Sequence, residues 1–343
     1  MTVEILKNTD SWPELSAGGE YPRLNGHSRA WLDAICKGLK HKPFVLNHRN
    51  NNGVADGILP LVLVQSMLFG KFLVSLPYLN TGGPWARNQP VASALVTRAC
   101  ELADELDVRY LELRLEHPIE HPRLTVCRTD KVHMRLALPT SDSELEASFK
   151  SKLRSQVKKS HEHGLTIAWG RCELLDDFYQ VFAINMRDLG TPVFSKNLFK
   201  EILTAFPNEA ELCIVKKDSI SIAAGLLVHC RGVSEVPSAS SLRTHNHTNA
   251  NMWMYRNLLK RAIERGSHTF DFGRSSVDSG TYKFKSQWGA QPYPANWQYC
   301  IRKGSADEMR PDSEGKKKLV KIWQRLPVAL TRLIGPDIIR GVP

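Results

Sequence analysis

The stretch Phe270–Pro292, FDFGRSSVDSGTYKFKSQWGAQP, decides how the rest of the chain is interpreted. It predicts a short strand at 269–272 that Gly273 breaks, then a loop of small and polar residues at 274–281. The extended pattern resumes at 282–288. A strand that ends in a loop dense in Arg, Lys, Asp and Ser is typical of a functional site, because a rigid scaffold aims such side chains. A solvated loop with a few ion pairs is the structural alternative.

An amphipathic helix is expected just before this stretch. Apolar residues recur at three- and four-residue spacing from Met252 to Ile263, basic residues fill the other positions, and Gly266 follows as a cap.

Two further stretches belong with this one. They are LFGKFLVSLPY at 68–78 and NMRDLGTPVF at 185–194. With the third motif, and in this order, they resemble the FemAB-like acyltransferases of the GNAT superfamily, in particular the subgroup associated with exosortase/PEP-CTERM exopolysaccharide systems. The resemblance leaves out the last 40 residues of the chain. It implies an α/β fold with mixed sheets, arranged as tandem GNAT-like acyl-CoA N-acyltransferase domains.

The whole chain has the composition of an ordinary globular protein, with 42% hydrophobic and 24% charged residues. Its 343 residues suggest two domains. The net charge of +11 and the pI of about 9.3 favour acidic partners: nucleic acid, phosphorylated cofactors or an anionic membrane surface.

The cysteines and the N-terminal sequence indicate the cellular compartment of the protein. The seven cysteines form no CxxC pair, so neither a zinc site nor a disulfide framework is indicated. The N-terminus lacks the basic and apolar regions of a secretion signal, and the longest apolar run, 57–70, is too short to span a bilayer. We expect a cytoplasmic protein, with peripheral contact at the inner membrane face left open.

Hydrophobic periodicity divides the chain into two α/β halves. The first half is expected to hold helices at 27–39 and 91–106 and strands at 43–47, 57–65, 72–76, 108–116 and 132–138. The second is expected to hold helices at 143–163, 174–189 and 197–206 and strands at 165–169, 220–228 and 235–240. We place an N-terminal domain at 1–139, a C-terminal FemAB-type acetyltransferase domain at 140–302 and a basic tail at 303–343.

The tail combines a lysine run at 316–318 with apolar residues and two prolines. Such a basic amphipathic segment either lies on an anionic membrane or packs as a C-terminal helix on the second domain.

The residues show no Ser-His-Asp or Cys-His nucleophile set and no metal-ligand spacing among the twelve histidines. Direct attack of an amine on the acyl donor, without a covalent enzyme intermediate or a metal, fits what remains, and the resemblance implies the same. Such a reaction needs donors or positive charge for the developing oxyanion and an acceptor for the amine proton.

The resemblance gives the candidate site, expected in the cleft between the two domains. Lys285 would stabilise the oxyanion or anchor a donor phosphate, and Asp271 would orient the amine or accept its proton. Each has a structural alternative, a surface ion pair for Lys285 and a loop cap for Asp271. The substrate-binding candidates are Arg274, Lys283, Arg187, Asp188, Thr191, Tyr78, Asn80, Gly82 and Gly83.

The acyl donor is either acyl-CoA or aminoacyl-tRNA. The phosphate-binding R/Q-x-x-G-x-G/A run of CoA-dependent GNAT enzymes is missing, and so is the long helical arm of some tRNA-dependent relatives. The expected acceptor is an amine on a sugar, an exopolysaccharide or a cell-envelope precursor. A non-catalytic protein that binds an anionic glycan or nucleic acid is the alternative.

Overall fold

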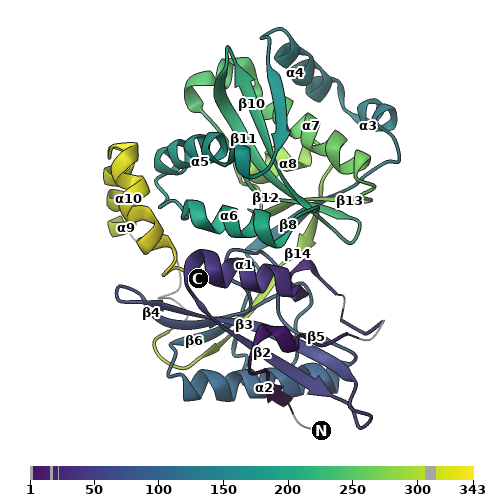
Figure 1. The fold of residues 1–343 in the computed structure, drawn as a ribbon, viewed down its shortest axis with the longest axis vertical. Coiled ribbons are helices and arrows are strands. Elements are labelled where there is room, and N and C mark those ends of the chain that lie inside the picture. The colour runs from purple at the N-terminus through teal and green to yellow at the C-terminus, as the bar shows by residue number, and fades with distance from the viewer. Residues whose placement is uncertain (1–2, 16–17, 22, 306–313) are drawn as a thin grey trace. The chain divides into compact units, whose positions relative to one another are not determined.

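The computed structural model describes residues 3–343 except 16–17, 22 and 306–313, and no side chain at 314–317. The chain forms two compact units (Figure 1). The first comprises 1–130, 294–313 and 337–343, and the second comprises 131–293 and 314–336.

The first unit is built on a mixed sheet in the order β1-β2-β3-β4-β6-β15-β7, with β5 paired to β3. Its strands are β1 (Val3–Ile5), β2 (Lys42–Arg49), β3 (Ala55–Ser66), β4 (Gly70–Val74), β5 (Trp85–Ala86), β6 (Tyr110–Leu115), β7 (Val126–Arg128) and β15 (Asn296–Ile301). Its helices are α1 (Arg29–Leu39) and α2 (Gln89–Glu105). The β4–β6 pair is parallel, and the other pairs are antiparallel.

The second unit repeats this plan in the order β14-β8-β13-β12-β11-β10-β9, with β12 and β13 parallel. Its strands are β8 (Lys131–Ala137), β9 (Thr166–Gly170), β10 (Ala210–Lys217), β11 (Ile220–Cys230), β12 (Val233–Ser241), β13 (Thr269–Ser276) and β14 (Gln291–Pro294). Its helices include α3 (Asp142–Ser148), α4 (Ser151–His161), α5 (Leu175–Leu189), α6 (Lys196–Ala205), α7 (Ala250–Glu264) and α8 (Gly280–Ser286). The expected fold of two mixed α/β domains is confirmed.

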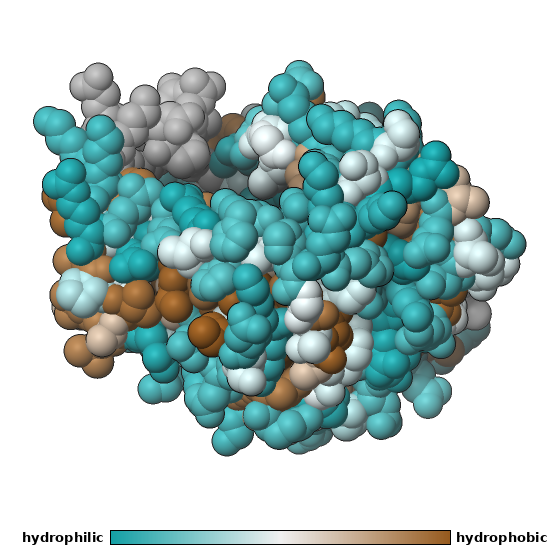
Figure 2. Space-filling model, turned by 90° about the horizontal axis from the view of Figure 1, so that it is seen from above, coloured by the Kyte–Doolittle hydropathy of each residue, from teal (hydrophilic) through white to brown (hydrophobic). Residues whose placement is uncertain are grey.

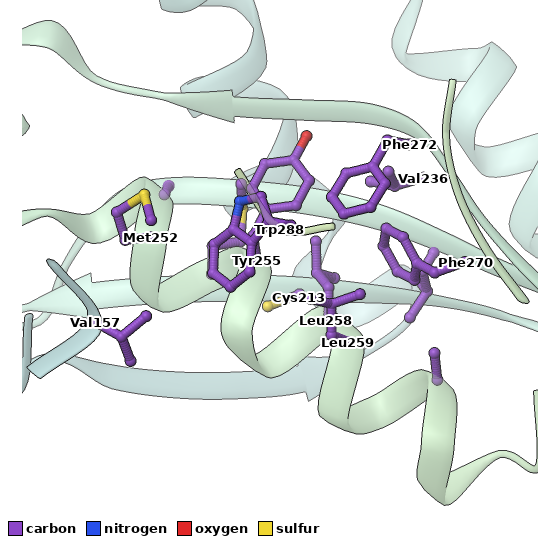
Figure 3. Packing of buried hydrophobic residues seen from close by; sticks show 14 of the residues in the cluster. Val157, Cys213, Val236, Met252, Tyr255, Leu258, Leu259, Phe270, Phe272 and Trp288 are labelled. Carbon is purple, nitrogen blue, oxygen red and sulfur yellow. The ribbon is translucent and has the colours of Figure 1, made fainter. Parts of the chain in front are cut away.

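Helix α7 packs its apolar stripe on the sheet to form the core of this unit (Figure 3). Tyr255 of α7 stacks on Phe272 of β13, with ring centroids 5.6 Å apart. Trp288, just beyond α8, lies 6.3 Å from the same tyrosine ring. This aromatic cluster fixes α7 and α8 against the strand that carries the signature stretch.

The signature stretch differs from its prediction in two ways. Strand β13 does not end at Gly273 but continues to Ser276, with a bulge between Asp271 and Arg274. The expected extended segment at 282–288 is wrong, because α8 begins at Gly280. The Ser279 hydroxyl oxygen accepts a hydrogen bond from the Tyr282 amide at 3.2 Å and caps this helix.

Two other boundaries also differ from expectation. The predicted helix at 143–163 is interrupted, because Phe149 takes an extended backbone and packs its ring on Trp288 at 5.5 Å. Strand β8 lies in the second sheet, paired with β13, so the second unit begins at Lys131 rather than at 140. Strand β15 returns to the first sheet only after residues 131–293 of the second unit.

The described part of the tail forms two helices, α9 (Glu314–Trp323) and α10 (Val328–Ile339). The Gln324 side chain donates to the carbonyl oxygen of Asp188 at 3.0 Å, and Arg187 donates to that of Leu326 at 3.3 Å. Residues 314–336 of the tail therefore belong to the second unit and pack on the end of α5, whereas 337–343 belong to the first unit. Within the described residues, no helix is both long and apolar enough to cross a membrane.

Candidate functional site

The parallel strands β12 and β13 pair over only three residues each, from Val233–Thr269 to Glu235–Asp271. Beyond that point β12 stays with β11 as far as Ser241, and β13 stays with β8 as far as Ser276. The two strands therefore separate in the middle of the sheet.

A cavity of about 230 Å³ lies at the far end of β12. It is bounded by the 3-10 helix η4 (Arg243–Thr248), the first turn of α7, and side chains of α4 and α8. Its lining is Gln156, Ser241, Leu242, His245, Asn246, Asn249, Ala250, Asn251, Met252, Phe284 and Gln287. We call it the α7 cavity.

The electrostatics of the α7 cavity suit an anion. The N-terminus of a fifteen-residue helix carries partial positive charge, and the first turn of α7 holds no acidic residue. Helix α4, which supplies Gln156, also exposes four cations that form no ion pair in the described part of the chain: Lys152, Arg154, Lys158 and Lys159. Of these, Arg154 and Lys158 line a separate pocket with Val157 and His161.

Lys285 lies at the bulge of β13. Its ammonium donates to the carbonyl oxygens of Gly273 and Arg274, each 3.1 Å away. The side chain is 8% exposed, and this burial lowers the pKa of Lys285 to about 8, although the charge of Asp271 opposes the shift. Lys285 is therefore an internal ammonium held by the bulge, not a solvated surface lysine.

Asp271 is buried beside Lys285, with both carboxylate oxygens engaged. One accepts from the Arg135 guanidinium at 2.9 Å, and the other accepts from the Gly273 amide at 2.7 Å. This second bond closes the turn at Gly273, whose φ of 76° favours glycine. Asp271 thus fixes the bulge that positions Lys285.

The other two predicted residues of this stretch, Arg274 and Lys283, lie in different environments. Arg274 is half-buried at the bulge, and its charge contributes to the lowered pKa of Lys285. Lys283, two residues before Lys285 on α8, is exposed to solvent.

The predicted turn after α5 forms part of the support for the tail. Arg187 pairs with Asp188 at 2.6 Å, and the α5 C-cap is Gly190. Thr191 follows, with its amide bonded to the carbonyl oxygen of Met186 at 2.9 Å. Among the residues that the structure describes, no hydrogen bond or ion pair joins this turn to Asp271 or Lys285.

Tyr78, Asn80, Gly82 and Gly83 lie in the first unit, in the loop after β4. There the parallel strands β4 and β6 are bridged by the chain itself: the amides of Ser75 and Gly82 donate to carbonyl oxygens of Glu112 and Arg114. A Cβ at Gly82 would clash with the Ser75 carbonyl, so close packing requires this glycine.

An arginine fills the space beneath this loop. Arg114 pairs with Glu112 at 2.6 Å, donates to the Leu79 carbonyl at 2.5 Å and stacks 4.2 Å from the Trp297 ring centroid. The space between β4 and β6 is thus occupied by protein, whereas in the second unit the α7 cavity adjoins Ser241 at the end of β12.

The sequence analysis missed the polar residues of the α7 cavity, from Ser241 to Asn251. The available signal was a run of polar residues between a strand and a helix, without the glycines of a nucleotide fingerprint. No group of three or more His, Cys, Asp or Glu suited to a metal ion occurs among the described residues.

Comparison with known proteins identifies the second unit. Residues 147–286 match the family model of the acetyltransferase (GNAT) domain. This match includes α4, the α7 cavity, the β13 bulge and Lys285. No curated protein matches the sequence.

Solved structures extend the likeness to most of the chain. FemX is 15% identical with a TM-score of 0.59, covering 86% of this chain and 93% of FemX. The C-terminal domain of a putative lysylphosphatidylglycerol synthetase from Agrobacterium fabrum is 11% identical with a TM-score of 0.53, covering 81% and 88%. A glucosamine N-acetyltransferase region of a fungal β-N-acetylglucosaminidase is 11% identical with a TM-score of 0.51, covering 87% and 38%. At these identities the likeness shows the fold.

Proposed function

Because the chain carries a GNAT acyltransferase domain, we propose that it transfers an acyl or aminoacyl group to an amine, with the donor bound in the α7 cavity. The observation that carries this proposal is the α7 cavity, which lies at a helix N-terminus and at the end of β12, the strand that parts from β13. The corresponding space in the first unit is filled by Arg114 and its loop. We therefore assign the donor to the second unit.

The donor carries phosphate, as acyl-CoA and aminoacyl-tRNA both do. The N-terminus of α7 and the exposed cations of α4 attract such an anion. The GNAT domain favours acyl-CoA. Aminoacyl-tRNA is kept as the second donor, because the cations of α4 extend along a helix rather than surrounding one phosphate.

In the reaction the amine nitrogen attacks the acyl carbonyl, and the carbonyl oxygen takes the negative charge. Lys285 has three ammonium donors, of which two are bonded to Gly273 and Arg274. We assign the third to this oxyanion. Collapse of the intermediate expels the donor thiolate or ribose oxygen. We assign the amine proton to water, because Asp271 already holds the bulge through Arg135 and the Gly273 amide.

We propose that the acceptor is an amine on a sugar or envelope precursor, as the sequence motifs suggest. One structure of similar fold, a glucosamine N-acetyltransferase region, is named for transfer to a sugar amine and fits this assignment. Tyr78 and Asn80 are our acceptor-binding candidates in the first unit. Tyr78 has a φ of 77°, which is strained for a residue with a side chain and is typical of functional loops.

We place the reaction in the cytoplasm. All seven cysteines are free thiols, as expected in a reducing compartment.

Coenzyme A and several acyl-CoA thioesters test the donor in a thermal-shift titration. Ligand at a hundred times its Kd adds about 2.7 kcal/mol of stability, which raises Tm by a few degrees. A saturable shift, followed by product with glucosamine as the trial acceptor, supports the proposal. No shift with any thioester excludes acyl-CoA and moves the assignment to aminoacyl-tRNA.

The second candidate function is non-catalytic binding of an anionic glycan or nucleic acid. The unpaired cations of α4 favour it. Binding of RNA that falls steeply with salt, without acyl transfer from any donor, would establish this function instead.

A further inference from the structure

Helices α9 and α10 present large apolar side chains to solvent. Leu319, Ile322 and Leu333 are 65%, 59% and 74% exposed. Val320, Leu330 and Ile334 add smaller exposed areas on the same two helices. Figure 2 shows hydrophobic side chains gathered at the left edge, the side on which Figure 1 draws these helices. Contiguous apolar surface of this kind usually marks a site of interaction.

The opposite face of the two helices is already used. Thr331 and Gly335 are buried, and Gly335 lies against Val193. The hydrogen bonds of Gln324 and Arg187 hold the connection between α9 and α10. The apolar side chains therefore belong to the outer face of a segment that is docked on the second unit.

Cations surround this apolar face. Residues 314–339, which form the two helices, hold six basic residues and two acidic residues, Glu314 and Asp337. Lys318, Lys321 and Arg325 are exposed, and none forms an ion pair within the described parts of the chain. Arg332 is also exposed and lies 5.2 Å from the Tyr179 ring centroid.

We propose that the outer face of α9 and α10 docks on the surface of a bilayer that contains anionic phospholipid. Apolar residues flanked by lysine and arginine fit the boundary between acyl chains and negative headgroups. A second copy of the chain fits less well, because a symmetric interface would bring this cationic face against itself. The proposal goes beyond acyl transfer and does not depend on the identity of the donor.

Co-flotation of the full chain with vesicles tests the proposal. We expect binding to vesicles of phosphatidylcholine with about 30% phosphatidylglycerol, a content of anionic lipid that is roughly that of an anionic leaflet. Binding to vesicles of phosphatidylcholine alone should be much weaker. The double variant K318Q/K321Q should lower the partition coefficient about fivefold for each lysine. The double variant I322S/L333S should lower it about tenfold or more.

Matched controls keep the result specific. K200Q/K260Q removes the same charge from exposed lysines of α6 and α7, and I220S removes an apolar side chain that is 58% exposed at the β10–β11 turn. Both controls should bind as the parent does. Binding unchanged by K318Q/K321Q and I322S/L333S, or no binding to anionic vesicles, overturns the proposal. Concentration-dependent dimers that I322S/L333S abolishes, without vesicle binding, would assign the face to a second copy.

Discussion

The ammonium of Lys285 lies 3.1 Å from the carbonyl oxygen of Gly273. The amide of Gly273 donates to the Asp271 carboxylate, and this hydrogen bond fixes the position of the glycine. The bulge of β13 and the lysine of α8 thus hold each other, although twelve residues separate them in the chain. A substitution at Lys285 therefore affects both catalysis and the local fold, and a test must separate the two.

K285M should abolish acyl transfer while the protein remains folded. Methionine keeps the length of the side chain but removes the ammonium, and it leaves two carbonyl oxygens without their donor, at about 1–3 kcal/mol. The measurement is product formation together with Tm. K283M on the same helix is the control, because Lys283 is exposed, and it should keep both. Full activity of folded K285M would remove Lys285 from the mechanism.

Stability should depend on pH through Lys285. Its pKa is lowered by burial from 10.5 to about 8, so between these values the unfolded chain binds more protons than the native chain. The parent should gain about 3 kcal/mol of unfolding free energy relative to K285M as the pH rises from 8 to 10.5. Urea unfolding of both proteins at pH 7 and pH 10 measures this. A constant difference at the two pH values would mean that Lys285 is not buried as described.

The rate should also report the protonation of Lys285. If its ammonium stabilises the oxyanion, kcat/KM falls as the pH rises through about 8, the pKa in the free enzyme. A pH profile of kcat/KM, with the known titration of the acceptor amine subtracted, checks this. A rate that rises through the same pH would make the neutral amine a base instead.

N251D should weaken donor binding without harming the fold. A carboxylate in the first turn of α7 interacts favourably with the helix dipole and stabilises the helix by about 0.3–1 kcal/mol. The same charge repels the phosphates assigned to the α7 cavity. We expect a several-fold higher KM for the donor and an equal or higher Tm. N208D makes the same charge change in an exposed loop of this unit and should leave KM alone. Equal KM values for the two variants would move the donor elsewhere.

E211Q should destabilise the second unit in a pH-dependent way. Burial alone raises the pKa of Glu211, but hydrogen bonds from His229, Arg261 and Arg265 outweigh it and leave that pKa well below its usual range. The carboxylate therefore stabilises the fold above about pH 4.5, and this contribution is lost as the pH falls. E211Q should cost about 3 kcal/mol at pH 7 and less at pH 3, by urea unfolding.

The sequence was sufficient for elements whose local pattern agrees with their final packing. The apolar spacing of α7 and the alternation of β6 are examples, and both elements lie where they were expected. Helix α8 was predicted as a strand because Tyr282 and Phe284 alternate with polar residues. The hydroxyl of Ser279 caps the first turn and favours the helix instead. The placement of β8 and β15 depends on pairing between distant segments, which no local pattern contains.

The sequence indicated only part of the candidate site, and the catalytic roles of these residues stay a prediction. Lys285, Asp271 and Arg274 are brought together by the bulge, and the motif had indicated all three. The α7 cavity was not visible, because segments distant in the chain line it and its lining lacks a glycine fingerprint. Sequence reasoning also could not show that Arg114 fills the space between β4 and β6.

The late return of β15 to the first sheet has a consequence for synthesis on the ribosome. Strand β6 ends at Leu115, but the partner that covers its edge begins only at Asn296, about 180 residues later. At a translation rate of roughly 5–20 residues per second, the edge of β6 lacks this partner for about 10–40 s. During that time most of the second unit is made and is able to fold. An unpaired strand edge is a template for aggregation. The period of translation between these two strands is therefore when the nascent chain most needs a chaperone.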